Sequence, residues 1–133
     1  MVKANGQGKR SLVVEDEPFI ARMCTRALGA EGFEVDIAAD GKSAQARLSD
    51  QGNRYDLCLI DIRTPGMNGI ELYRYLEESG SEMINRVIFT TGDVVNDKIK
   101  TFLEETGRPF LPKPFTLDEL RSVIRMARAL ASP

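Results

Sequence analysis

The architecture of this chain can be inferred from one stretch, Tyr55-Asp56-Leu57-Cys58-Leu59-Ile60-Asp61-Ile62-Arg63-Thr64-Pro65-Gly66. Residues 57–60 form a short, continuous apolar run, which is typical of a strand buried on both faces of a parallel sheet. Asp61 stands where this run ends, and Pro65-Gly66 then turns the chain. Open α/β sheets place their binding sites at this carboxyl edge. Asp is also an ordinary turn residue, so the other strand ends must show whether Asp61 is functional.

Length and composition indicate one soluble domain. The chain has 133 residues, of which 42% are hydrophobic and 29% charged, with a net charge of −2. This charge argues against direct nucleic-acid binding, and no apolar run is long enough to span a bilayer. Residues 1–10 lack the apolar segment of a signal peptide, so we expect a flexible lead-in there and a domain over 11–131. We expect a cytoplasmic protein without membrane insertion.

Cysteine and histidine usage narrows the chemistry further. Cys24 and Cys58 lie in apolar segments, which favours two reduced, buried thiols. The sequence contains no histidine. Without histidine or a Cys-x-x-Cys pair, the sequence argues against a zinc site, and Ser-His-Asp or Cys-His catalysis and a phosphohistidine are excluded.

Short apolar runs alternate with amphipathic segments along the whole chain. In the first helix, we expect an apolar face of Phe19, Ile20, Met23, Ala27 and Leu28. The alternation predicts a flavodoxin-like, doubly wound parallel sheet of five strands, in the order 2-1-3-4-5, with five helices. The expected strands cover residues 11–14, 35–38, 57–60, 87–90 and 110–113, and the helices about 18–29, 41–51, 69–79, 97–105 and 117–127.

Four of the five expected strands end in polar side chains that can bind a metal ion or take part in phosphoryl chemistry. These are Glu15 and Asp16 after the first strand, Asp61 after the third, Thr91 after the fourth and Lys113 after the fifth. Parallel strands bring these ends to one edge, where three carboxylates repel one another unless a cation or proton compensates them. Oxygen ligands of this kind suit Mg²⁺. Asp61 is then the plausible nucleophile, able to form an aspartyl-phosphate that a metal ion, an ammonium group and a hydroxyl stabilise.

Several motifs in this order resemble the receiver domain of two-component response regulators. They are Val13-Val14-Glu15-Asp16-Glu17-Pro18, Asp61 to Gly69, Thr91-Gly92 and Lys113-Pro114-Phe115. The resemblance runs from about residue 11 to 130, and residues 107–115 look similar to receivers attached to hybrid sensor histidine kinases. It also implies a cis peptide bond before Pro114.

The resemblance implies a role for each site residue. Asp61 is expected to be the phospho-acceptor, with Glu15, Asp16 and the Arg63 backbone carbonyl as further Mg²⁺ ligands. Thr91 and Lys113 are expected to contact the phosphoryl group. Thr91 is also expected to act in a switch together with the aromatic residue at position 110.

Four positions depart from the commonest family pattern. Glu15 replaces Asp, and its side chain should still reach the metal, directly or through water. Thr64 stands where Met is frequent, and Gly92 where Ala is frequent. Phe110 lacks the hydroxyl of the common tyrosine, so its switching would rest on packing, and its alternative role is a plain core residue.

The predicted function is a Mg²⁺-dependent phospho-acceptor that receives its phosphoryl group from a histidine kinase or phosphotransfer protein. Phosphorylation is expected to switch the face formed by the fourth helix, fifth strand and fifth helix, which is also a candidate homodimer surface. One alternative is a phosphohydrolase of the haloacid-dehalogenase type, although that family expects an Asp where Arg63 stands. Another is a degenerate receiver that only binds proteins.

Arg63 and Asp93 stand two residues beyond Asp61 and Thr91. One interpretation is that they are solvated loop charges, as exposed pairs usually are. Our hypothesis is that they cover the site and slow the attack of water on the phosphoryl group.

Overall fold

A computed structural model describes residues 9–50, 52–93 and 95–131. Its five parallel strands form one sheet in the order β2-β1-β3-β4-β5, as the sequence predicted. The strands are β1 (Lys9–Val14), β2 (Phe33–Ala38), β3 (Leu57–Asp61), β4 (Val87–Thr91) and β5 (Phe110–Pro112). The helices are α1 (Pro18–Ala30), α2 (Gly41–Ser49), α3 (Gly69–Glu78), the 3₁₀ helix η1 (Glu82–Asn85), α4 (Asp97–Thr106) and α5 (Leu117–Ala131).

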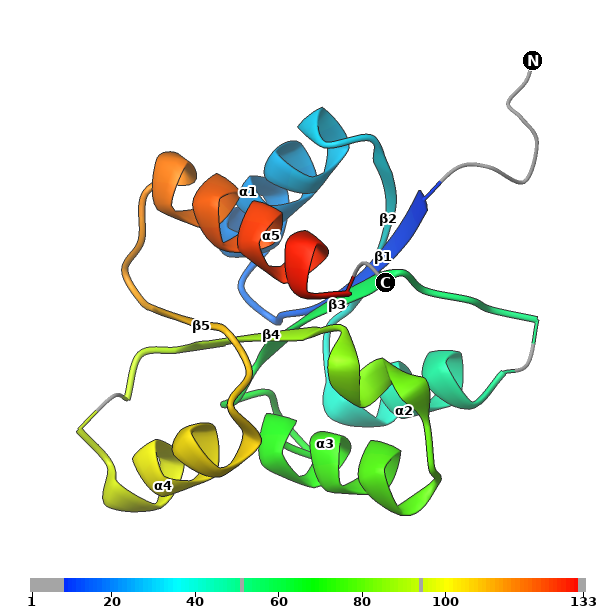
Figure 1. Cartoon of the computed structure of the whole chain (residues 1–133), viewed down its shortest axis with the longest axis vertical. Helices are drawn as coiled ribbons and strands as arrows, with labels where there is room; N and C mark the ends of the chain where they lie inside the picture. The colour runs from blue at the N-terminus through cyan, green and yellow to red at the C-terminus, as the bar shows by residue number, and fades with distance from the viewer. Residues whose placement is uncertain (1–8, 51, 94, 132–133) are drawn as a thin grey trace.

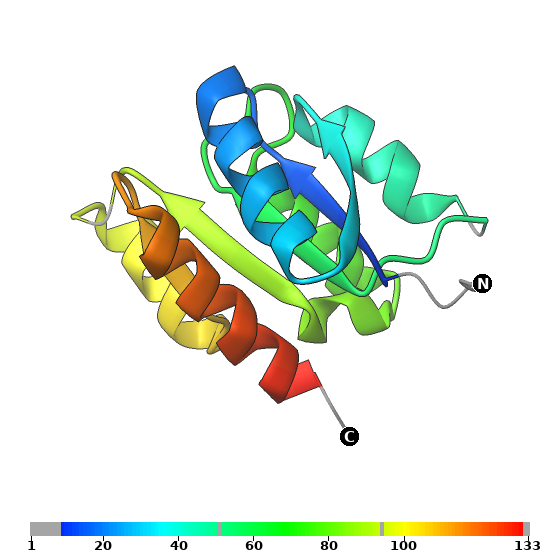
Figure 2. The ribbon, with the colours of Figure 1, turned by 90° about the horizontal axis from the view of Figure 1, so that it is seen from above.

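Helices cover both faces of the sheet, and Figures 1 and 2 show the layers. Helices α1 and α5 lie on one face, where they pack on Val13, Leu59 and Ile88. Helices α2, α3 and α4 lie on the other face, over a second cluster that includes Leu12 and Ile60. Burial on both sides explains why the central strands consist of continuous apolar runs.

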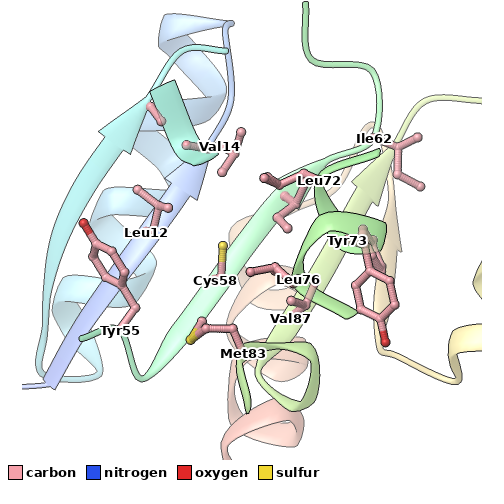
Figure 3. Packing of buried hydrophobic residues seen from close by; sticks show 14 of the residues in the cluster. Leu12, Val14, Tyr55, Cys58, Ile62, Leu72, Tyr73, Leu76, Met83 and Val87 are labelled. Carbon is pink, nitrogen blue, oxygen red and sulfur yellow. The ribbon is translucent and has the colours of Figure 1, made fainter. Parts of the chain in front are cut away.

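The α3 and α4 side of the core is shown in part in Figure 3, where Leu72, Tyr73 and Leu76 face the strands. The aromatic rings of Tyr73, Phe89 and Phe102 form a triplet, with ring centroids 5.2–5.6 Å apart. The tilted and edge-on arrangement of these rings is a favourable geometry for aromatic pairs. The triplet connects α3 and α4 to strand β4, which carries Phe89.

Local sequence signals explain where the helices begin. Asn68 accepts a hydrogen bond from the Glu71 N–H at 2.9 Å, and the Glu71 carboxylate accepts one from the Asn68 N–H at 2.9 Å. This capping box starts α3 directly after the loop that follows Asp61. Thr116 and Glu119 make the same reciprocal pair ahead of α5, so a capping box also starts the last helix.

The structure also corrects some expectations. Strand β1 begins at Lys9, so residues 9 and 10 pair with β2 and do not belong to a flexible lead-in. The rest of that lead-in, residues 1–8, lies outside the described residues. Phe19 was expected on the buried face of α1, but 65% of its surface is exposed. It lies in the first turn of α1, beside the acidic loop, ahead of the residues that reach the sheet.

Two further observations concern the helices. The sequence prediction omitted η1, because a single 3₁₀ turn is too short to produce a helical apolar period. Within the described residues, no helix combines the length and apolar character needed to cross a bilayer.

Candidate functional site

Asp61 is the last residue of β3, and its side chain is almost completely buried at the carboxyl edge of the sheet. One carboxylate oxygen, Oδ1, accepts a hydrogen bond from the Arg63 backbone N–H at 3.1 Å. The other, Oδ2, accepts one from Lys113 Nζ at 3.0 Å. Both bonds orient the carboxylate at the sheet edge.

The acidic pair after β1 lies beside Asp61, as predicted. Glu15 is buried, whereas Asp16 is exposed. Each of Glu15, Asp16 and Asp61 offers a carboxylate oxygen within 4.8 Å of the other two. This is the only such group of three in the described ranges 9–50, 52–93 and 95–131. The three oxygens can converge on one metal ion.

The carboxylate of Glu15 is only partly satisfied. Its Oε2 accepts a hydrogen bond from the Glu17 backbone N–H at 3.1 Å. Its Oε1 lies 3.0 Å from Lys113 Nζ, but the angles do not make that contact a hydrogen bond. This oxygen is therefore partnered by its ion pair with Lys113, and its charge also suits it to a divalent cation.

Lys113 provides the positive charge of the site. Its ammonium group lies 3.0 Å from Glu15, 3.0 Å from Asp61 and 3.1 Å from Glu17. Burial alone would lower the pKa of Lys113, but the close contacts with the Glu15 and Asp61 carboxylates outweigh burial and hold the pKa above its usual value. The ammonium group therefore stays charged.

Burial likewise dominates the behaviour of Glu15. Burial and the neighbouring Asp61 charge raise the pKa of Glu15, while the Glu17 N–H and Lys113 oppose the rise. Lys113 is one positive charge beside two buried carboxylates, and it does not fully compensate them. The site therefore has a local excess of negative charge, which a divalent cation would relieve.

Thr91 ends β4, the strand next to Asp61, and is fully buried. Its hydroxyl accepts a hydrogen bond from the Asp93 N–H at 3.0 Å. The Lys113 N–H donates to the Thr91 carbonyl at 2.8 Å, which connects the two strand ends. The Lys113-Pro114 peptide bond is cis, as the resemblance implied.

The two charged residues beyond the strand ends make an ion pair. The Arg63 guanidinium pairs with the Asp93 carboxylate, so the β3–α3 and β4–α4 loops are linked. The Arg63 side chain is 60% exposed and that of Asp93 is 27% exposed. The two are therefore paired with each other and are not isolated loop charges.

Phe110 is not a core residue, because 43% of its surface is exposed. It lies at the start of β5, at the rim of a groove of about 370 Å³ between α4 and β5. Leu103 and Arg108 also line this groove. The alternative of a plain core role for Phe110 is therefore wrong, and its role as a switch stays a prediction.

The sequence prediction gave no role to Glu17, which the structure places at the site through its ion pair with Lys113. The available signal was the uninterrupted run of acids after β1. Cys24 and Cys58 are free, buried thiols, as expected, and burial raises the pKa of both to about 12. Neither thiol is suited to nucleophilic chemistry near neutral pH.

This fold and edge geometry agree with comparisons with known proteins. The family model described as the response regulator receiver domain matches residues 11–125. The chain therefore belongs to the response regulator receiver domain family. It is a two-component signalling module by family.

Named relatives support the same assignment. The transcriptional regulatory proteins TrcR and TcrA of Mycobacterium tuberculosis are 33% identical over 136 residues and 37% identical over 118 residues, respectively. These matches cover 98% and 89% of this chain but only 51% and 45% of the relatives, so the chain spans about half their length. A CheY-like receiver domain protein from Methanospirillum hungatei gives a TM-score of 0.78 at 27% identity, over 92% of this chain and 95% of that one.

Proposed function

We propose that this chain is a phospho-acceptor whose Asp61 takes a phosphoryl group from a histidine kinase or a phosphotransfer protein. The observation that carries the proposal is the contact between the Asp61 carboxylate and Lys113 Nζ, 3.0 Å long, beside the acidic group of Glu15 and Asp16. The site thus joins a nucleophile to fixed charges of both signs. Phosphoryl transfer depends mainly on such positioning and charge neutralisation.

A phosphohistidine donor must belong to a partner, because this chain has no histidine. An oxygen of the Asp61 carboxylate attacks the phosphorus of the partner's phosphohistidine, and the bond between phosphorus and imidazole nitrogen breaks. The imidazole leaves with the bonding electron pair and takes up a proton. The Lys113 ammonium and the Thr91 hydroxyl then bind oxygens of the new aspartyl-phosphate.

The residues at the sheet edge fit a Mg²⁺ ion. Glu15, Asp16, Asp61 and the Arg63 backbone carbonyl would hold it, and the convergence of the three carboxylates, each with an oxygen within 4.8 Å of the other two, supports this assignment. A set of a few carboxylates completed by water and phosphate oxygens is the environment that Mg²⁺ prefers. When bound, Mg²⁺ neutralises charge on the transferring phosphoryl group.

The output surface is the face formed by α4, β5 and α5. After phosphorylation of Asp61, the Thr91 hydroxyl binds the phosphoryl group and the exposed ring of Phe110 moves. These two changes bias the face toward one of its two conformations. The same face would pair with a second copy of the chain. The relatives TrcR and TcrA are named transcriptional regulatory proteins, so gene regulation through a further part of the protein is one output. The other context that we infer is a receiver domain attached to a hybrid sensor histidine kinase.

Two other functions make different demands on the site. A haloacid-dehalogenase-type phosphohydrolase would use an acid two residues beyond the nucleophile, where Arg63 is instead paired with Asp93. A degenerate receiver would lack part of the acceptor, metal or lysine set, all of which this chain contains. Both observations favour the phospho-acceptor.

Intact mass spectrometry with Mg²⁺ and a small phosphodonor such as acetyl phosphate tests the proposal. We expect one phosphoryl group to accumulate on the wild-type chain and none on Asp61→Ala, with Asp56→Ala as a matched control that is phosphorylated like the wild type. Rapid donor hydrolysis without accumulation would favour the hydrolase. If the phosphoryl group does not accumulate and the donor is not hydrolysed, the result would favour the degenerate receiver that only binds proteins.

A further inference from the structure

The turn between β2 and α2 touches both loops that carry the proposed metal ligands. On one side, the Ala38 carbonyl accepts a hydrogen bond from the Glu15 N–H at 3.0 Å. On the other side, the Gly41 N–H donates to the Pro65 carbonyl at 3.3 Å. The turn contributes no side chain to the site, yet it bridges the acidic loop after β1 and the loop that carries Arg63.

The backbone of Gly41 packs directly against the β3–α3 loop and leaves no room for a side chain. A Cβ atom at this position would lie 1.7 Å from the Met67 carbonyl oxygen and 2.6 Å from the Met67 carbonyl carbon. Both atoms are backbone, so neither can rotate away as a side chain does. Any larger residue would therefore displace the β3–α3 loop or α2 itself.

Thr64 holds the same loop from within. Its side chain is buried, and its hydroxyl donates to the Met67 carbonyl at 3.2 Å. The base of the loop is closed by the Gly69 N–H, which donates to the Ile62 carbonyl at 2.9 Å. The Met67 carbonyl is thus bound by Thr64 on one side and abutted by Gly41 on the other. Arg63 lies directly between Ile62 and Thr64, inside these restraints.

We infer that Gly41 and Thr64 are positioning residues, which set the Arg63 carbonyl relative to the acidic pair and so tune the affinity for Mg²⁺. This inference rests on the proposed function, because it assigns the Arg63 carbonyl to the metal. Groups that orient metal ligands without touching the metal commonly change affinity by about 10–100-fold when they are removed. A hydroxyl at position 64, where the family commonly has Met, provides such a restraint.

Isothermal titration of the whole chain with MgCl₂ tests the inference. We expect Gly41→Ala to raise the Kd for Mg²⁺ about tenfold. Gly29→Ala is the matched control, because a Cβ there meets nothing within 4 Å, and its Kd should equal that of the wild type. Thr64→Val keeps the side-chain shape but removes the hydroxyl, so its Kd should also rise, whereas Thr64→Ser should restore it.

A second measurement separates positioning from general damage. Hydrogen exchange without Mg²⁺ should be faster at residues 62–69 in Gly41→Ala and Thr64→Val, and unchanged in the strands. If Gly41→Ala does not fold, Thr64→Val and Thr64→Ser carry the test. Wild-type affinity for Mg²⁺ in both Gly41→Ala and Thr64→Val would overturn this inference but not the proposed function. Absence of Mg²⁺ binding to the wild type would instead overturn the proposed function.

Discussion

Lys113 shows how one residue can serve both stability and function. Its ammonium group neutralises part of the charge of Glu15 and Asp61, which would otherwise repel each other in a buried position. In the proposed function, the same group, 3.0 Å from Asp61 Oδ2, is expected to bind the phosphoryl group. The carboxylate of Glu17 competes for this ammonium from the exposed side. If Asp61 is phosphorylated as proposed, we expect this ammonium group to exchange a carboxylate partner for the phosphoryl group.

The Arg63–Asp93 ion pair yields a kinetic prediction. Because the pair links the loops on both sides of the acceptor, we expect it to restrict water at the phosphoryl group. Replacing both residues with Ala should speed dephosphorylation several-fold, and each single variant should lie between the double variant and the wild type. Loss of the phosphorylated species with time, followed by intact mass, gives the rates. An unchanged half-life in the double variant would contradict the hypothesis.

Asp36 yields a prediction for the pH dependence of stability. The Tyr55 hydroxyl, at 2.7 Å, and the Arg10 guanidinium, at 2.6 Å, lower the pKa of Asp36 below its ordinary value of 3.8. A lowered pKa means that the charged form adds stability above pH 3.8, and that this stability is lost as the pH falls through the folded-state pKa. Asp36→Asn should therefore lower the free energy of unfolding by about 1 kcal/mol at neutral pH.

The difference between wild type and Asp36→Asn should stay constant from pH 7 to about 5 and shrink below 3.8. Urea unfolding at a series of pH values measures it. Tyr55→Phe removes the largest cause of the lowered Asp36 pKa. The stability difference between Tyr55→Phe and the double variant with Asp36→Asn should therefore depend less on pH. A difference that persists unchanged at pH 3 would argue against the assignment.

At the scale of elements, α4 is attached to the sheet through a small set of side chains. It buries Ile99, Phe102 and Leu103, and only the ring of Phe102 joins the aromatic triplet with Tyr73 and Phe89. Because these anchors are side chains and not strand pairings, α4 can shift without unpairing a strand. This suits the proposed switching of the face that α4 forms with β5 and α5.

Phe102→Ala should therefore loosen α4 and destabilise the whole domain. Removing a buried phenyl ring and leaving a cavity costs about 3–5 kcal/mol in the free energy of unfolding. Thr101→Ala, at an exposed position of the same helix, should change it by only about 0.5 kcal/mol. Chemical denaturation measures both variants. A loss below about 1 kcal/mol for Phe102→Ala would show that the triplet does not anchor α4.

At the scale of the whole molecule, we predict a homodimer that forms through the face of α4, β5 and α5. Phe110 at the rim of the α4–β5 groove and Met126 on α5 leave apolar surface exposed on this face. We expect the unmodified chain to be monomeric and the phosphorylated chain to dimerise. Light scattering coupled to size-exclusion chromatography measures the mass of each form, and Phe110→Ser should weaken the dimer. A phosphorylated chain that stays monomeric at high concentration would contradict this prediction.

Much of this molecule is predictable from local sequence. Continuous apolar runs indicated strands buried on both faces, and the alternation with helices indicated the sheet order, because right-handed crossovers leave few topologies. The residues proposed for the site were identifiable because each follows directly after such a run. Boundaries were less predictable: β1 begins two residues before the expected strand, at the charged residues Lys9 and Arg10.

Tertiary structure was needed to identify the particular contacts that side chains of distant segments make. The pairing of Lys113 with Glu17, the link between Arg63 and Asp93, and the exposure of Phe19 and Phe110 depend on how elements meet in space. The fit of Gly41 against the Met67 carbonyl is a relation of the same kind. Residue type and spacing determine which groups stand at the end of each strand, because periodicity and turn chemistry act locally. Which of those groups touch is decided by packing, because contacts and burial join residues far apart in the sequence.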